Sequence, residues 1–268
     1  MTNMEPVQIL SASTDSAQPR AAPIWTLLGA DLHMQTLNPE YAPVGLLEMM
    51  VPAPARVLDI GCFCGGTGRW LKRRFPGVEV IGIESSAPAA ARARASYERV
   101  IEAPIENVDF EAEDLLPGSV DAIVAADVLE HLVNPWAVLQ RLRPLLTPQG
   151  ALYVSLPNVR NLNVLLRLVN GEWRYAGAGI LDVSHLRFFT RAQAIEMLAE
   201  TGWRTHEIRV NPDPQLTPKF AGRSLADVRS IDTPKLSLKN LTQEDVLELL
   251  ALQFFMRASP AIAAASQR

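Results

Sequence analysis

The stretch VLDIGCFCGGTG, residues 57–68, decides the fold of this chain. A short apolar run ends at glycines and a helical pattern follows it, which predicts a strand, a tight turn and a helix. Glycine lets a ligand approach the backbone closely, and the start of a helix presents unpaired N–H groups and the positive end of its dipole. The stretch therefore predicts a ligand-binding loop at the carboxyl end of a strand.

Strands and helices continue to alternate along the chain. We expect seven strands, at 56–60, 78–84, 100–105, 119–127, 151–157, 203–210 and, after a capped helix, at the end of 242–259. Helices are expected within 67–75, 85–100, 134–150, 158–173 and 190–202. This alternation predicts an α/β fold with a Rossmann-like, doubly wound and mostly parallel seven-stranded sheet, with helices on both faces.

The composition is that of a globular protein with a sizeable core. Of the 268 residues, 48% are hydrophobic and 20% are charged, and the formal net charge is −4. This charge balance gives no electrostatic footprint for nucleic acid, so we expect no nucleic-acid partner. No apolar run is long enough to span a bilayer, so no membrane span is expected either.

The N-terminal residues differ in composition from the rest of the chain. Residues 1–22 are polar and rich in Ser, Ala, Pro and Gln, which predicts a flexible tail. We expect residues 23–268 to form one domain, with an N-terminal helical cover and an insertion around 211–245. The N-terminus has no apolar signal core, so a cytoplasmic location is expected.

The two cysteines, Cys62 and Cys64, are separated by one residue. A disulfide between them would be strained and would close almost no loop. A zinc site in this loop would need further soft ligands, and the chain has no other cysteine. A disulfide and a metal site are therefore both excluded for the loop.

Two acidic residues indicate the kind of ligand that the loop binds. Glu84 ends the second expected strand, nineteen residues after Gly65, where a carboxylate can hold the hydroxyls of a ribose. Asp59 lies two residues before the first glycine, where it would repel a pyrophosphate but can face an ammonium group. A Walker loop is excluded because no G-K-[S/T] follows. A positively charged nucleoside fits best, which is S-adenosylmethionine.

These motifs resemble those of class I S-adenosylmethionine-dependent methyltransferases over roughly residues 40–210. VLDIGCFCGGTG resembles the first motif of that family, VIGIE the acidic second motif and VDAIVAADVLEHL the fourth. The resemblance implies that residues 23–268 form a single methyltransferase domain. It also implies a set of cofactor-binding residues. These are Asp59, Gly61, Cys62, Phe63, Gly65, Glu84, Ser85, Ile105, Asp127 and Val128.

The chain departs from the family pattern at two places. Phe63 stands where the family usually has a glycine or another small residue. In the third-strand region the family usually offers an acid to the adenine amino group, but here Pro104 lies near that position. Glu102, Ile105 and Glu106 are the candidates to replace that acid, and the sequence does not choose among them.

A second motif, D-x-x-H-L-R-F-F-T at 182–190, resembles that of a bacterial subgroup of these enzymes. Many members occur with glycosyltransferases or in natural-product and surface-polysaccharide pathways. The resemblance implies methyl transfer from S-adenosylmethionine to oxygen or nitrogen of a small-molecule or sugar acceptor. Oligomerisation is left open.

Three residues are candidates for catalysis. A hydroxyl acceptor benefits from a general base with a pKa near neutrality, and histidine is the usual choice. His131 follows the fourth expected strand, and His185 lies in the irregular segment after the fifth, where Asp182 is placed to orient its ring. The structural alternatives are a loop-anchoring His131 and an ion pair between Asp182 and Arg187.

Two further alternatives concern metal and function. Asp127, Glu130 and His131 resemble a divalent-metal constellation of some quinone-type O-methyltransferases, but the same residues recur in relatives without metal, and we assign no metal. A nucleic-acid or protein methyltransferase is disfavoured by the charge and by ADVLEHL after the fourth strand. The alternative of a different class is a non-catalytic S-adenosylmethionine-binding scaffold or regulatory subunit.

Overall fold

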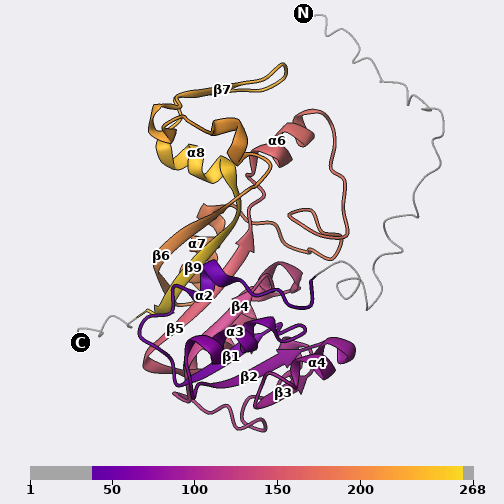
Figure 1. The fold of residues 1–268 in the computed structure, drawn as a ribbon, viewed down its shortest axis with the longest axis vertical. Helices are drawn as coiled ribbons and strands as arrows, with labels where there is room; N and C mark the ends of the chain where they lie inside the picture. Colours follow the sequence, from indigo (N-terminus) through magenta and orange to yellow (C-terminus); the bar gives the residue numbers. More distant parts are fainter. Residues whose placement is uncertain (1–37, 262–268) are drawn as a thin grey trace, which may run out of the picture.

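The computed structural model describes residues 38–261, and its centre is a seven-stranded sheet (Figure 1). The strand order is β3-β2-β1-β4-β5-β9-β6. The strands are β1 (Arg56–Ile60), β2 (Glu79–Glu84), β3 (Arg99–Glu102), β4 (Val120–Ala126), β5 (Leu146–Pro157), β6 (Trp203–Pro212) and β9 (Ala251–Pro260). Only β9 runs antiparallel to its neighbours, β5 and β6. The mostly parallel seven-stranded fold predicted from the sequence is confirmed.

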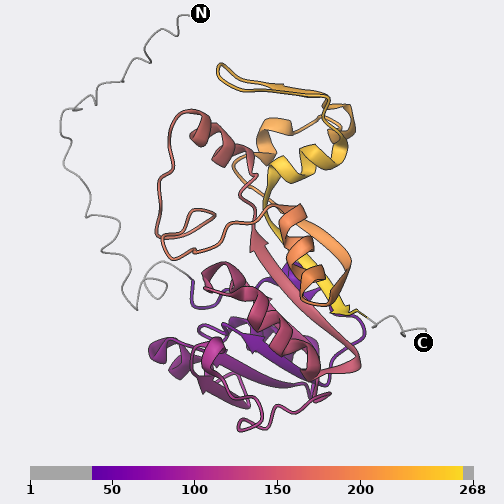
Figure 2. The same ribbon diagram turned by 180° about the vertical axis from the view of Figure 1, so that it is seen from behind.

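Helices cover both faces of the sheet (Figures 1 and 2). The α-helices are α2 (Val44–Leu47), α3 (Gly66–Arg74), α4 (Ala87–Ala93), α5 (Pro135–Leu142), α6 (Leu162–Val169), α7 (Arg191–Glu200) and α8 (Gln243–Leu250). One buried cluster joins α2, α3 and α4 to one face of the sheet, and another joins α5 and α7 to the opposite face. Side chains of a strand alternate between these clusters: Val57 belongs to the first, and Leu58 to the second.

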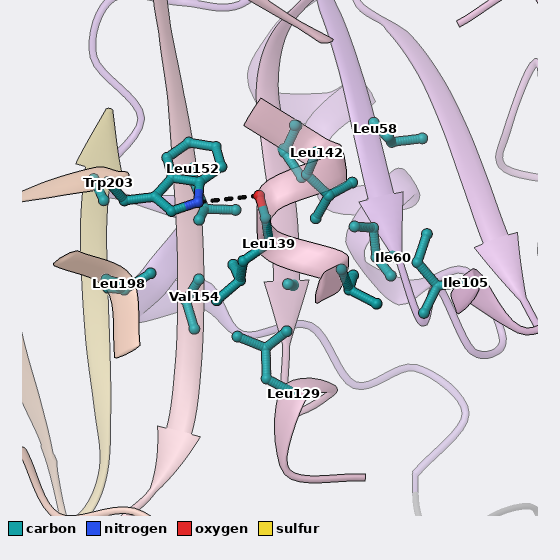
Figure 3. Close-up of a cluster of buried hydrophobic side chains, with 14 of the residues drawn as sticks. Leu58, Ile60, Ile105, Leu129, Leu139, Leu142, Leu152, Val154, Leu198 and Trp203 are labelled. Atoms are coloured by element: carbon teal, nitrogen blue, oxygen red, sulfur yellow. Dashed lines mark hydrogen bonds between the residues drawn. The ribbon is translucent and has the colours of Figure 1, made fainter. Parts of the chain in front are cut away.

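The larger cluster is closed by Trp203 at the start of β6 (Figure 3). Its indole Nε1 donates a hydrogen bond to the backbone carbonyl of Leu139 in α5, at 3.2 Å. Trp203 packs near Leu152 and Leu198, so it connects the edge strand, α5 and α7. This hydrogen bond satisfies the only polar group of a fully buried aromatic side chain.

Several predicted helices are shorter in the structure. The helix expected at 134–150 ends at Leu142, because Pro144 lacks an N–H and the chain passes through a 3₁₀ turn into β5, which already contains Gly150. The helix expected at 85–100 ends at Ala93, and the strand expected at 100–105 ends before Pro104. Both helix caps expected around 190 and 242 are present as Thr side chains.

The excursion after β6 forms a small unit of its own at one end of the molecule (Figure 1). It contains two 3₁₀ turns and the hairpin strands β7 (Ser230–Asp232) and β8 (Ser237–Lys239). A third buried cluster joins it to α6 and α8, with Leu216, Val246 and Leu249 at its centre. The excursion is therefore packed against the two helices that follow β5 and precede β9.

Part of the expected N-terminal organisation lies outside the described residues. The predicted tail 1–22 and the first part of the helical cover, up to residue 37, are not described. Within 38–50 the structure contains one helical turn, α2. Among residues 38–261, no helix is long and apolar enough to cross a membrane.

Candidate active site

A cavity of about 650 Å³ opens at the carboxyl ends of β1, β2 and β4. This is where open α/β sheets bind ligands, and the volume lies within the usual range for small-molecule sites. All but one of the predicted site residues line it. They are Asp59, Gly61, Cys62, Phe63, Glu84, Ser85, Ile105, Asp127, Val128, His131, Asp182 and His185. The exception is Gly65, where a Cβ would face Ala93 and Ser96.

The glycine loop has three residues in the left-handed region. Gly61 (φ +69°) brings the backbone close to Val128: a Cβ on Gly61 would lie 2.6 Å from the Cγ2 atom of that valine. Gly65 (φ +89°) precedes α3 and faces Ala93. Phe63 (φ +45°) adopts a conformation that is uncommon for an aromatic residue. The loop conformation therefore depends on glycine at 61 and 65 and is strained at Phe63.

Glu84 is buried at the end of β2 and holds the backbone on both sides of the cavity. One carboxylate oxygen accepts a hydrogen bond from the backbone N–H of Phe63, and the other accepts from that of Ser86, both at 2.8 Å. Each carboxylate oxygen has two acceptor positions, so the group can also accept from a ligand. The predicted ribose-binding carboxylate therefore lies in the cavity and also fixes the loop.

Asp59 is buried beneath the loop and is held by Tyr97. The Tyr97 hydroxyl donates to the Asp59 carboxylate at 2.5 Å and accepts from the backbone N–H of Gly68 at 3.0 Å. The pKa of Asp59 is raised to about 7, chiefly by burial; the Tyr97 hydrogen bond lowers it, and the nearby charge of Glu84 raises it. A cationic ligand group beside Asp59 would favour its ionised form.

The two cysteines of the loop are packed in the protein interior. Both are buried, and no disulfide joins them. The sulfur of Cys62 packs against Gly82 of β2, where a Cβ would approach it to 2.6 Å. Burial raises the pKa of the Cys62 thiol, so Cys62 is a packed, protonated side chain at the cavity wall.

Asp127 ends β4 with a positive φ of 54° and is held by its neighbours in the sheet. Its carboxylate accepts from the Ser155 hydroxyl at 2.7 Å and from the Gln253 amide at 3.3 Å. Gln253 also interacts with the Tyr41 hydroxyl; burial and the charge of Asp127 raise the pKa of Tyr41 to about 12. These contacts join the segment before α2 to β4, β5 and β9 at the cavity floor.

The segment 38–43 is tied to the glycine loop by Arg69 of α3. The Arg69 guanidinium donates to the carbonyls of Pro39 and Cys64 and forms an ion pair with Glu40 at 2.9 Å. Gly66 permits the contact, because a Cβ there would lie 1.9 Å from the Tyr41 carbonyl oxygen. This segment forms one wall of the cavity, through Asn38, Tyr41 and Pro43.

The third-strand region supplies the opposite wall. Pro104, Ile105 and Glu106 line the cavity. Glu102 instead forms an ion pair with Arg94 at 2.7 Å, away from the cavity lining. Of the three candidates for an adenine contact, Ile105 and Glu106 therefore have access to the cavity.

The predicted catalytic residues come together in the cavity lining. The rings of His131 and His185 meet edge to face, with centroids 4.7 Å apart. His131 Nδ1 is 3.1 Å from the Ser184 hydroxyl, which donates to Asp182 at 2.6 Å. His185 Nδ1 lies 3.0 Å from the carbonyl of Ile180. Asp182 thus contacts His131 through Ser184. That Asp182 orients the ring of His185 stays a prediction.

Glu130 lies against this pair. Its side chain is 1% exposed, and neither carboxylate oxygen has a hydrogen-bond partner among the described residues. Its Oε1 atom is 4.0 Å from His185 Nε2. Burial raises the pKa of Glu130 well above its usual range, and the charges of Asp127 and Asp182 raise it further.

Sequence reasoning missed Tyr41, Tyr97 and Gln253 as parts of the site. Tyr97 follows α4 and reaches under β1, and Gln253 reaches Asp127 because β9 pairs with β5. No local motif marks these residues, since each acts through a contact between segments far apart in the chain. Arg187, named above as a possible ion-pair partner of Asp182, donates hydrogen bonds to the backbone carbonyls of Leu186 and Val133.

Comparisons with known proteins agree with this geometry. Residues 58–152 match a family model described as a methyltransferase domain. The ubiquinone biosynthesis O-methyltransferase of Xanthomonas campestris is 29% identical over 151 residues, which cover 56% of this chain and 62% of that protein. The trans-aconitate 2-methyltransferase of Escherichia coli is 30% identical over 168 residues, covering 59% and 62%. The chain thus spans less than two thirds of either relative.

Solved structures share the fold. An S-adenosylmethionine-dependent methyltransferase from Archaeoglobus fulgidus superposes with a TM-score of 0.56 at 18% identity, covering 84% of this chain and 96% of that one. The cyclase SpnF superposes with a TM-score of 0.52 at 17% identity, covering 82% and 80%. The fold alone therefore does not fix the reaction. What the sequence comparisons show is that residues 58–152 match a methyltransferase domain and that the chain is similar to S-adenosylmethionine-dependent methyltransferases over part of its length.

Proposed function

We propose that this protein transfers a methyl group from S-adenosylmethionine to oxygen or nitrogen of a small-molecule or sugar acceptor in bacterial natural-product or polysaccharide biosynthesis. The observation that carries the proposal is one continuous cavity. Its lining includes Glu84 and Asp59, which suit the cofactor, and His131 and His185, which suit an acceptor.

Several lining residues suit the separate parts of the nucleoside. Glu84 has acceptor positions for ribose hydroxyls, and Asp59 favours an ammonium group nearby. Ile105 and Ser85 line the side where the adenine would lie. Gly61 allows the close backbone approach that the methionine part requires. When bound, S-adenosylmethionine supplies an electrophilic methyl group on a sulfonium.

In the reaction, a lone pair of the acceptor forms the new bond to the methyl carbon while the S–CH₃ bond breaks and its electron pair stays on sulfur. The protein chiefly aligns the two reactants. We assign removal of the acceptor proton to the histidine pair, with Asp182 and Ser184 holding His131 in one orientation.

The charge of the cavity lining restricts the acceptor. Among the described lining residues there are six carboxyl groups and two imidazoles, and there is no lysine or arginine. An acceptor that buries a carboxylate or phosphate would therefore meet like charges without a partner. A neutral hydroxyl or a protonated amine is favoured, which argues against trans-aconitate, the acceptor named for one relative.

The same proposal includes the organisation of the chain. We retain residues 1–22 as a tail, 23–268 as a single methyltransferase domain with a cover before β1 and an insertion around 211–245, and a cytoplasmic location.

The test uses two measurements on the full chain. Calorimetry with S-adenosylmethionine and its demethylated product examines cofactor binding. Incubation with isotope-labelled S-adenosylmethionine then compares dihydroxybenzyl alcohol, dihydroxybenzylamine and dihydroxybenzoate, which share a ring and differ in charge. Transfer to the neutral or cationic compound alone is expected. Transfer preferentially to the benzoate would contradict the acceptor assignment. Cofactor binding without turnover on a broad acceptor panel would favour a non-catalytic binding subunit.

A further inference from the structure

Three side chains of the cavity lining form a cluster, and the proposed methyl transfer gives a role to its two histidines but none to Glu130. One carboxylate oxygen of Glu130 and one ring nitrogen each of His131 and His185 lie within 4.8 Å of one another. Glu130 and His185 are buried, and His131 is half-buried. All three line the cavity, so a small ion can reach them.

The hydrogen bonds around the two rings determine which nitrogen of each ring carries the proton and which keeps a lone pair. A carbonyl oxygen only accepts, so His185 must carry its proton on Nδ1, opposite Ile180. The single hydroxyl proton of Ser184 is donated to Asp182, so His131 Nδ1 must donate to Ser184. In both neutral rings the lone pair is then on Nε2. Metal-binding histidines characteristically have their second nitrogen held by a carbonyl or a carboxylate in this manner.

Glu130 provides the independent observation. A carboxyl group that is almost completely buried normally has hydrogen-bond partners, because leaving it without them is costly. Both oxygens of Glu130 lack a partner among the described residues, and Oε1 points to His185 Nε2 at 4.0 Å. This distance is too long for a hydrogen bond but leaves space between the two atoms. An ion between them would satisfy the carboxylate.

We propose that Glu130, His131 and His185 bind one divalent transition-metal ion in the cavity. Two imidazoles and one carboxylate suit Zn²⁺ and similar ions, whereas Mg²⁺ prefers oxygen ligands alone. Zinc bonds of about 2.0–2.2 Å place neighbouring ligand atoms about 3.3 Å apart. Side-chain shifts on the order of 1 Å would therefore close the present cluster around the ion.

This ligand set differs from the one that the sequence pattern indicates. The carboxylate of Asp127 accepts hydrogen bonds from Ser155 and Gln253, and Asp127 is not part of the cluster. His185, from the segment after β5, takes the third place instead. With the ion bound, both histidine lone pairs are occupied, so an ion that binds an acceptor oxygen and lowers the pKa of its hydroxyl would replace proton removal by the histidine pair. This role rests on the proposed methyl transfer, but metal binding itself does not.

The test is a metal titration of the full chain after chelator treatment, without cofactor. Zn²⁺ competes with a chromophoric chelator, and Co²⁺ reports its ligands by its visible absorption. We expect one tight equivalent of Zn²⁺ and much weaker Mg²⁺ binding. His185→Asn and Glu130→Gln should each weaken Zn²⁺ binding by about 100-fold or more, since each removes a direct ligand. His206→Asn, an exposed histidine beside Ser259, is the matched control and should have no effect.

Asp127→Asn separates the two ligand sets and should leave Zn²⁺ affinity within about threefold of wild type, because Asp127 is not a proposed ligand. Thermal melts by circular dichroism check that each variant folds. If Glu130→Gln does not fold, the Zn²⁺ affinity of His185→Asn alone tests the proposed ligand set. Three results would overturn the site: no stoichiometric Zn²⁺ binding, loss in Asp127→Asn with retention in His185→Asn, or a sulfur-to-cobalt charge-transfer band indicating Cys62 or Cys64. Failure of the proposed methyl transfer would appear separately, as absent transfer from isotope-labelled S-adenosylmethionine while Zn²⁺ still binds.

Discussion

The backbone N–H of Phe63 donates a hydrogen bond of 2.8 Å to the Glu84 carboxylate. This bond couples the glycine loop after β1 to the end of β2 and fixes the loop at a residue with φ +45°. The aromatic side chain therefore does not close the cavity: Phe63 lines it together with Gly61. Glu84 has two functions in this account, since it positions the loop and faces the ribose.

The raised pKa of Asp59 predicts a pH-dependent stability. The fold shifts the pKa of this carboxyl upward to about 7, so between about pH 4 and 7 the folded state binds more protons than the unfolded state. Its contribution to the free energy of unfolding therefore falls as the pH rises through this range. The Asp59→Asn variant has no buried charge at this position, and its amide oxygen can still accept the hydrogen bond from the Tyr97 hydroxyl. The variant should gain stability relative to wild type between pH 5 and 8, on the order of 2–4 kcal/mol.

Calorimetric melts of the cofactor-free protein at several pH values measure this difference. Asp227→Asn, which changes an exposed carboxylate in the excursion, serves as the control and should give a difference that does not vary with pH. A constant difference for Asp59→Asn would show that Asp59 is ionised throughout. The account of its burial would then be incorrect.

Arg69 should control how firmly the cavity wall is held. Arg69→Gln removes the ion pair with Glu40 and weakens the links to Pro39 and Cys64. We expect the demethylated cofactor to bind about 5- to 30-fold more weakly, corresponding to about 1–2 kcal/mol, and mainly through faster dissociation. Stopped-flow dissociation measures the rate. Arg73→Gln, an exposed arginine on the same helix, is the matched control, and equal effects of both changes would refute the assignment.

The contacts of Trp203 predict how much stability the protein loses when this side chain of the larger core cluster is shortened. Trp203→Phe removes the indole N–H that donates to Leu139 and leaves that carbonyl buried, at a cost of about 1–3 kcal/mol. Trp203→Ala also leaves a cavity and should cost about 3–5 kcal/mol. Urea denaturation curves give both values. A loss of less than about 0.5 kcal/mol in Trp203→Phe would mean that the hydrogen bond contributes little.

The local features of the fold could be predicted from the sequence, and the contacts between distant segments could not. The alternation of apolar strands and capped helices predicted the sheet, and the motif residues Asp59 and Glu84, predicted to bind the cofactor, line one cavity in the structure. Helix lengths were overestimated where Pro144 stops α5, because the apolar pattern continues into β5.

The parts of the site that sequence reasoning missed depend on tertiary pairing. Gln253 reaches Asp127 only because β9 inserts between β5 and β6. The partner of His131 is Ser184, and this contact spans 53 residues of chain. Gly65 is not part of the cavity lining; its positive φ and its closeness to Ala93 show that the turn before α3 requires glycine there, and its contact with the cofactor stays a prediction. A one-dimensional motif does not encode which of its residues face the cavity.

The measurement that tests the central claim most directly is calorimetric titration of the demethylated cofactor into wild type, Glu84→Gln and Glu79→Gln. Glu79 lies at the other end of β2, paired with Arg56, and serves as the matched control. The account predicts 1:1 binding by wild type and by Glu79→Gln. It predicts at least about 30-fold weaker binding by Glu84→Gln, since hydrogen bonds to a charged group are worth about 2 kcal/mol. No binding by wild type, or unchanged binding by Glu84→Gln, would contradict it.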